Sequence, residues 1–336
     1  MENNLETNNE QNENVNFESR LNLQPLKESV AQVKAEIAKV IVGQNKMIDQ
    51  LLVAVLSNGH VLLEGVPGVA KTISAKLLAK TLSLDFSRIQ FTPDLMPSDI
   101  IGTSVFDLSK STFDFKKGPI FSNFVLIDEI NRAPAKTQAA LFEVMEERQI
   151  TADGTTYILD RPFLVIATQN PIEQEGTYRL PEAQLDRFLF KINIGYPNLS
   201  EEIHIIQKEN ELQSRDKMSD IATIISQSNI IAFQELVKEI LIEQNLIEYI
   251  AKIVLNTREN AFLYLGASPR ASIAILNASK GFAALRGRDF VTPDDIKDAA
   301  IPVLQHRVVV TPEREMEGIT SIEIIKQIVD SVEIPR

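Results

Sequence analysis

The chain has 336 residues, of which 44% are hydrophobic, and it carries a formal net charge of -12 at pH 7. One compact core rarely serves more than ~250–300 residues, so the length predicts two domains. The acidic balance argues against binding of nucleic acid, which needs clustered Lys and Arg, and against anionic membranes. The sequence contains no cysteine, which excludes disulfides and thiolate metal sites.

The first residues lack the charged-then-apolar pattern of a secretory signal, and no apolar run approaches the ~20 residues needed to cross a bilayer. We therefore expect a cytoplasmic protein without membrane insertion. Residues 1–20 are rich in Asn, Glu and Gln, a composition that buries too little apolar surface to offset the entropy of ordering. We interpret them as a disordered tail, with a partner-binding tail as the alternative.

Residues 21–197 combine helical periodicity with short apolar strands. Apolar residues recur every three or four positions from Leu21 to Ile41, and a second helix is expected near Lys46–Asn58. Strands are expected at His60–Glu64, Arg88–Phe91, Phe124–Ile127, Phe163–Ala167 and Phe188–Ile194. Helices between them are expected at Lys71–Leu82, Ala135–Glu147 and Glu182–Arg187. This alternation predicts an α/β core built on a parallel five-stranded sheet.

Two segments interrupt the alternation of strands and helices. Thr103–Lys116 alternates apolar and polar residues around a polar centre, and Gln149–Leu159 contains Asp153-Gly154, a strong hairpin signal. We interpret both as β-hairpins inserted between core elements. Simple surface hairpins without a function are the alternative.

Beyond Pro197 the strand signal stops, and residues 198–336 predict a second, all-helical domain. The domain boundary is therefore expected at about residue 197. Helices are expected at Ser200–Ser214, Ser219–Ser226, Phe233–Glu239, Gln244–Asn260, Pro269–Arg286 and Thr292–Gln305.

The strongest chemical motif lies between the first strand and the helix that follows it. It consists of Gly65, Val66, Pro67, Gly68, Val69, Ala70, Lys71 and Thr72, which form a phosphate-binding loop in its usual strand–helix context. Backbone N–H groups of such a loop point at the phosphates of ATP. Lys71 is expected to pair with the β- and γ-phosphates and Thr72 to bind Mg²⁺. A plain Gly/Pro turn is the alternative.

One residue departs from the common form of this loop, G-x-x-x-x-G-K-[ST]. Ala70 stands directly before the lysine, where that pattern has glycine. A methyl group there limits the freedom of the backbone, so the affinity for nucleotide could be reduced.

A second motif is the apolar run Val125–Ile127 followed by Asp128 and Glu129, which resembles a Walker B strand. Asp128 is expected to hold Mg²⁺ and Glu129 to orient or deprotonate the attacking water. An Asp-Glu pair that merely ends a strand is the alternative, although a phosphate-binding loop about fifty residues earlier argues against it.

Three further residues resemble sensing elements of AAA+ ATPases. Asn170, after the strand at 163–167, resembles the polar sensor of the γ-phosphate, with an Asn-Pro turn as the alternative. Arg187, just before the last strand, resembles an arginine finger that acts on the ATP of a neighbouring subunit. Arg270, at a helix that begins with proline, resembles the second sensor arginine of the lid.

The arginine-finger assignment of Arg187 has two alternatives. Arg187 is alternatively a surface residue paired with Asp186 or Glu182, and Arg179 is a weaker candidate for the finger. The segment with Val42 and Gly43, ahead of the second helix, resembles the loop that packs near adenine.

Taken together, residues 38–308 resemble the MoxR family of AAA+ ATPases. The motifs are GVPGVAKT, QFTPDLMPSDIIG, GPIF, LIDEINRAPAKTQAALFEVMEE, ATQNPIEQEGTYRLPEAQLDRF and GASPRAS. The resemblance implies an AAA+ core with a helical lid, and hairpins that line the pore of a homo-hexamer as the helix-2 insert and the pre-sensor-1 hairpin. It also implies a client with a von Willebrand factor A domain, and a displaced lid whose Arg270 acts on a neighbour's nucleotide.

The function expected from these residues is hydrolysis of Mg-ATP to remodel or activate a partner protein. A magnesium-chelatase-like motor subunit is one alternative. A DNA helicase or loader is disfavoured by the acidic charge, and a non-hydrolysing nucleotide switch or scaffold is favoured by Ala70 alone.

Overall fold

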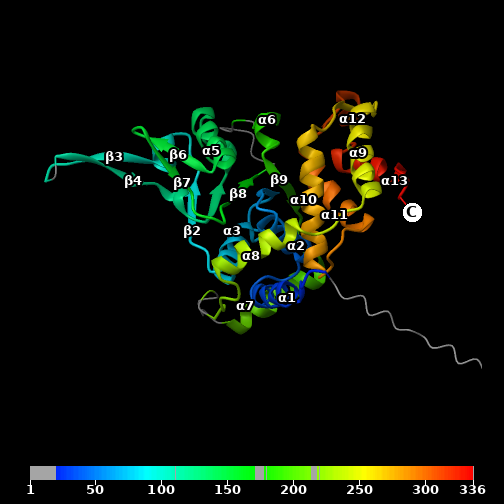
Figure 1. The fold of residues 1–336 in the computed structure, drawn as a ribbon, viewed down its shortest axis with the longest axis horizontal. Helices are drawn as coiled ribbons and strands as arrows, with labels where there is room; N and C mark the ends of the chain where they lie inside the picture. Colours follow the sequence, from blue (N-terminus) through cyan, green and yellow to red (C-terminus); the bar gives the residue numbers. More distant parts are fainter. Residues whose placement is uncertain are drawn as a thin grey trace, which may run out of the picture.

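A computed structural model describes residues 20–109, 111–170, 178, 180–212, 218 and 220–335. The expected disordered tail, apart from Arg20, lies outside the described residues, as does Arg179. Within the described part, a body built on a β-sheet lies beside a group of helices from the C-terminal half (Figure 1). No helix in that part is long and apolar enough to cross a membrane.

The central sheet has five strands, all parallel, in the order β2-β5-β8-β1-β9. The expected parallel five-stranded sheet is thereby confirmed. Its strands are β1 (His60–Gly65), β2 (Phe86–Gln90), β5 (Phe124–Asp128), β8 (Leu164–Gln169) and β9 (Phe188–Ile194). Every residue of β5 is buried, because helices cover both faces of a parallel sheet.

Helices pack on the two faces of the sheet. The α/β body contains α1 (Gln24–Ala38), α2 (Asn45–Leu56), α3 (Lys71–Thr81), α4 (Pro97–Ile101), α5 (Ala135–Glu147) and α6 (Glu182–Leu185), with 3-10 turns η1 (Pro119–Phe121) and η2 (Ile130–Arg132). Successive side chains of β1 point to opposite faces of the sheet and pack in different hydrophobic clusters. Val61 and Leu63 join the cluster of α1, α2 and α3, whereas Leu62 joins the cluster of Phe142 from α5.

Both expected hairpins are confirmed. The first consists of β3 (Gly102–Asp107) and β4 (Thr112–Lys117), and it projects far from the body (Figure 1). The second consists of β6 (Gln149–Ala152) and β7 (Thr155–Ile158), and Asp153 and Gly154 have positive φ angles at its turn.

The C-terminal half is helical with one small ribbon. Its elements are α7 (Leu199–Leu212), α8 (Gln227–Lys238), α9 (Gln244–Glu259), β10 (Leu263–Leu265), α10 (Pro269–Leu285), α11 (Pro293–Leu304), β11 (Val309–Val310), α12 (Pro312–Met316) and α13 (Ser321–Ser331). The expectation of a purely helical domain is therefore wrong in one respect, because β10 and β11 pair antiparallel.

The expected helix over Ser219–Ser226 is also wrong. Among its described residues, 220–226 are not helical, and Ser226 instead caps α8. The backbone N–H groups of Ile224 and Ile225 both donate to the carbonyl of Thr81, at the end of α3. This tertiary hydrogen bonding replaces the local bonds that a helix would make.

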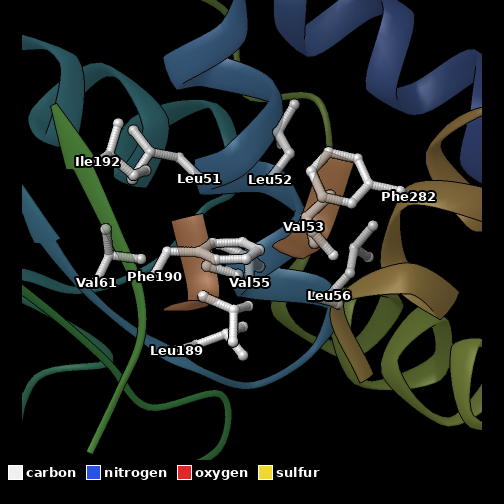
Figure 2. Packing of buried hydrophobic residues seen from close by; sticks show 14 of the residues in the cluster. Leu51, Leu52, Val53, Val55, Leu56, Val61, Leu189, Phe190, Ile192 and Phe282 are labelled. Carbon is white, nitrogen blue, oxygen red and sulfur yellow. The ribbon is translucent and has the colours of Figure 1, made fainter. Parts of the chain in front are cut away.

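The helical half packs directly against the α/β body. Residues of α2 and β9 meet Phe282 of α10 in one buried cluster (Figure 2). At Gly281, an added Cβ would lie 2.7 Å from Val53 of α2, so glycine permits the close approach of α10 and α2. The hydrophobic core thus runs across residue 197, and the domain boundary there remains a prediction.

Candidate nucleotide-binding site

The loop between β1 and α3 has the backbone shape of a phosphate cradle. At Gly65, an added Cβ would lie 2.8 Å from the carbonyl oxygen of Ile194, so a side chain does not fit. Gly68 has φ +88° with open space around it, and Ala70 has φ +61°. The loop then enters α3 at Lys71, where the first N–H groups of the helix lack helical partners and are available to an anion.

The two polar side chains of the loop lie over the carboxyl ends of the central strands. Lys71 Nζ donates to the carbonyl of Gly65 at 2.5 Å and to that of Gln169, the last residue of β8, at 3.5 Å. Thr72 Oγ1 lies 3.5 Å from Asp128 Oδ1, at the end of β5. Three strands therefore bring a cation, a hydroxyl and a carboxylate together.

Asp128 and Glu129 are linked through one threonine. Thr168 Oγ1 donates to Asp128 Oδ1 at 3.2 Å and accepts from the backbone N–H of Glu129 at 3.0 Å. Arg88 Nε forms an ion pair of 2.6 Å with Asp128 Oδ2. Glu129 itself has φ +58°, which turns its side chain out of the strand direction.

The carboxylate of Glu129 is held by two neighbours. Gln90 Nε2 donates to its Oε2 at 2.8 Å, and Arg132 Nε lies 3.0 Å from the same oxygen. Sequence reasoning missed Arg88, Gln90, Thr168 and Arg132. A usable signal existed for the first two, because Arg88 and Gln90 alternate along β2 and point to one face.

A pocket of about 390 Å³ lies beside the loop and is mainly apolar. Ligand pockets of small molecules span roughly 300–1,000 Å³ and combine apolar walls with a few polar groups. Val42 borders this pocket, whereas Gly43 lines a neighbouring one. The lining residues are Val40, Ile41, Val42, Gln44, Pro67, Gly68, Val69, Ala70, Ile73, Tyr196, Pro197, Glu202 and Ile205.

These residues are of the chemical kinds that a bound Mg-ATP needs. The pocket suits the base, the loop and Lys71 suit phosphates, and hydroxyl and carboxylate oxygens are the ligands that Mg²⁺ prefers. Asn170 directly follows β8 and is buried, so it lies at the same edge of the sheet.

The candidate arginines lie elsewhere. Arg187 directly precedes β9, whose Phe188 aligns with His60 at the start of β1, while Ile194 aligns with Gly65 at its end. Six residues of strand span about 20 Å, so the backbone of Arg187 is that far from the phosphate loop. The acidic partner of Arg187 in the described residues is neither Asp186 nor Glu182, because its Nε lies 3.4 Å from Glu146 Oε2.

Arg270 lies in the first turn of α10 and also contacts Glu146. Its guanidinium nitrogen is 2.7 Å from Glu146 Oε1. Asp186, beside Arg187, is instead paired with the buried Arg307 at 2.7 Å and accepts from Ser268 at 3.0 Å. The structure thus gathers both candidate arginines at the amino edge of the sheet, away from the phosphate loop of the same chain.

The phosphate loop, the Walker B strand and the helical lid define a P-loop ATPase of the AAA+ type. A model of the ATPase family associated with various cellular activities (AAA) matches residues 60–190, and a model of the AAA lid domain matches residues 255–328. Chaperone MoxR1 of Mycobacterium tuberculosis is 44% identical over 310 residues, which cover 90% of this chain and 81% of that protein.

Two further relatives agree. The uncharacterized protein YeaC of Bacillus subtilis is 45% identical over 299 residues, 89% of this chain and 92% of that protein. A crystal structure of a proposed ATPase from Cytophaga hutchinsonii superimposes with a TM-score of 0.86 at 44% identity, covering 94% of this chain and 97% of that one. The chain belongs to the MoxR family of chaperone-like, ATP-binding AAA+ ATPases.

Proposed function

We propose that this protein hydrolyses Mg-ATP in a homo-hexameric ring in the cytoplasm and uses the cycle to remodel or activate a partner protein. One observation carries the proposal. Lys71 and Thr72 from one segment, and Asp128 and Glu129 from another, meet at one edge of the sheet beside an apolar pocket.

Each residue has a role that its chemistry supports. Lys71 and the loop N–H groups bind the phosphates, and Thr72 and Asp128 hold Mg²⁺, which neutralises phosphate charge when bound. Glu129 orients the attacking water and accepts its proton, and Asn170 contacts the γ-phosphate. Gln90 and Arg132 hold the Glu129 carboxylate in a defined orientation.

The position of the arginines supports action between subunits. Arg187 and Arg270 lie at the edge of the sheet opposite to the phosphate loop of their own chain. We infer that both stabilise charge on the ATP of the next subunit, which requires a ring or another closed assembly.

The β3–β4 hairpin supplies the surface that contacts the client. Phe106 and Phe113 pair across its strands with ring centroids 5.0 Å apart, and Leu108 at its tip is 86% exposed. An exposed apolar tip on a projecting hairpin is suited to bind the client in the pore of the ring. The client we propose is a protein with a von Willebrand factor A domain.

Hydrolysis is tested by two substitutions with a matched control. Glu129→Gln should bind ATP with nearly wild-type affinity but release phosphate at least about 100-fold more slowly, because water activation is lost while the binding contacts remain. Lys71→Ala should abolish binding, whereas Lys76→Ala, an exposed lysine on the same helix, should change neither quantity. Phosphate release by Glu129→Gln at the wild-type rate would remove the assignment of the catalytic carboxylate.

The same assay separates the alternatives. A wild-type protein that binds ATP and releases no phosphate, with or without client, would instead be a nucleotide-dependent switch. The client is tested by co-purification with ATP-bound Glu129→Gln as bait from native lysate. Recovery of no von Willebrand factor A-domain protein, although one is present, would remove that partner and leave the ATPase proposal intact.

A further inference from the structure

Glu146 lies in the last turn of α5 and contacts both candidate arginines. Its Oε1 is 2.7 Å from a terminal guanidinium nitrogen of Arg270, and its Oε2 is 3.4 Å from Nε of Arg187. The two arginines come from different parts of the chain, one before β9 and one on α10 of the lid. One carboxylate therefore joins the α/β body to the lid at this point.

The surroundings of Glu146 restrict both arginine side chains. The guanidinium of Arg187 lies 5.9 Å from the centre of the Phe142 ring, one turn earlier on α5. Asp186, next to Arg187, forms an ion pair with Arg307 and accepts a hydrogen bond from the hydroxyl of Ser268, two residues before Arg270. Two cations this close repel each other, and a shared carboxylate offsets that repulsion.

Both side chains still reach solvent. The side chains of Arg187 and Arg270 are 30% and 53% exposed, and a guanidinium has five N–H donors, more than one carboxylate uses. Glu146 accepts a hydrogen bond from Arg270, whereas its contact with Arg187 Nε is an ion pair without a hydrogen bond. Both guanidinium groups remain able to contact an anion from outside the chain.

We propose that Glu146 is a positioning residue that holds Arg187 and Arg270 as one unit for action on the nucleotide of the neighbouring subunit. This inference rests on the proposed hydrolysis across subunits. It adds that a residue outside the nucleotide pocket sets the positions of the two arginines. Glu146 makes no contact with the nucleotide in this role. It reduces the conformational freedom of both arginines before the interface closes.

The test compares Glu146→Gln with Glu143→Gln, an exposed glutamate one turn earlier on the same helix. Loss of positioning by about 1 Å lowers turnover by roughly 10- to 100-fold. Glu146→Gln should therefore lower kcat by that factor while KM, fluorescent-nucleotide binding and ring size stay within about twofold. Glu143→Gln should match the wild type, and Glu146→Asp should recover part of the rate.

A mixing experiment separates positioning from a general structural role. Glu146→Gln acts on the arginine side of an interface and Glu129→Gln on the nucleotide side, so mixed rings of the two should regain activity. Mixtures of Glu146→Gln with Arg187→Ala should not, and the double variant should be no slower than Arg187→Ala alone.

Several outcomes would overturn the inference. A higher kcat in Glu146→Gln would make the carboxylate a brake on the arginines, and an unchanged kcat would make it a bystander. A raised KM or failed assembly in both Glu146→Gln and Glu146→Asp would make it structural. If Glu129→Gln retains turnover, the proposed hydrolysis itself fails, whereas an inactive Glu129→Gln with a fully active Glu146→Gln removes only the role of Glu146.

Discussion

At the scale of single residues, Ala70 carries a conformational cost in the phosphate loop. Its φ of +61° lies in the left-handed region, which disfavours residues with a Cβ by roughly 1–2 kcal/mol. Two residues earlier the backbone also has a positive φ, +88°, but Gly68 has no Cβ and adopts it without this cost. The loop therefore keeps its cradle shape with one glycine and one strained alanine at positive φ angles, supported by the packing of β1 and α3.

Replacing Ala70 with glycine should remove this strain. We expect Ala70→Gly to raise the free energy of unfolding by on the order of 1 kcal/mol, measured by urea denaturation. Ala31→Gly, at an exposed position inside α1, should lower it by about the same amount, because glycine weakens a helix interior. A lower stability of Ala70→Gly would mean that the left-handed conformation is not strained here.

At the scale of elements, the base of the β3–β4 hairpin contacts the second hairpin, and the tip of the β3–β4 hairpin projects beyond these contacts. Phe115 of β4 stacks on Tyr157 of β7 with ring centroids 4.8 Å apart, and Phe121 of η1 contacts both rings. Since β6 follows α5 directly, this aromatic cluster connects the β3–β4 hairpin to the helix that carries Glu146. The exposed tip lies beyond the cluster.

The double substitution of Phe106 and Phe113 to Ala separates client contact from packing. Because Phe106 and Phe113 are 45% and 71% exposed and the base is held by the aromatic cluster, assembly and basal phosphate release should stay near wild type, while stimulation by the client disappears. Phe115→Ala, at the base, should instead lower stability by on the order of 1–3 kcal/mol. Failure of the Phe106 and Phe113 variant to assemble would show that the tip packs against a neighbouring subunit.

At the scale of the whole molecule, the sheet separates two sets of functional residues. The carboxyl edge holds the candidate nucleotide site, and the amino edge holds Arg187, Arg270 and the two buried histidines. His60 Nδ1 accepts from the N–H of Val165, and His306 Nε2 donates to the carbonyl of Phe188. Both rings serve as neutral hydrogen-bonding groups in the core.

Because these two histidines are buried and neutral, we expect the protein to lose stability in mild acid. Burial, with the nearby charge of Arg148, lowers the pKa of His60 from 6.5 to about 3, and burial lowers the pKa of His306 well below its usual value. The unfolded chain takes up these protons below about pH 6.5 and the folded chain does not, so stability falls as the pH drops from 6.5 toward 3. For His60 the loss is on the order of 1 kcal/mol per pH unit in this window, and the protonation of His306 acts in the same direction.

Urea denaturation between pH 6.5 and 4 checks this expectation. His60→Gln and His306→Gln should each lower the free energy of unfolding at every pH. Each should also make that free energy fall less steeply as the pH drops. His204→Gln, at an exposed position on α7, controls for the loss of a histidine. An unchanged slope in both core variants would assign the acid sensitivity to other groups.

Much of this molecule follows from local patterns in the chain. Apolar runs and helical periodicity predict the five strands, both hairpins and most helices, because each pattern lies within one short segment. The phosphate loop and Asp128–Glu129 are likewise contiguous motifs, recognisable because their chemistry needs those residue types at that spacing.

The tertiary structure decided what joins distant segments. The sheet order β2-β5-β8-β1-β9 sets Arg88, Gln90 and Thr168 around the two carboxylates, and no local pattern encodes that order. Backbone bonds to Thr81 replaced the helix expected after residue 219. The packing of the lid brought Arg187 and Arg270 to one glutamate, since their separation of about 80 residues in the chain contains no information on their distance in space.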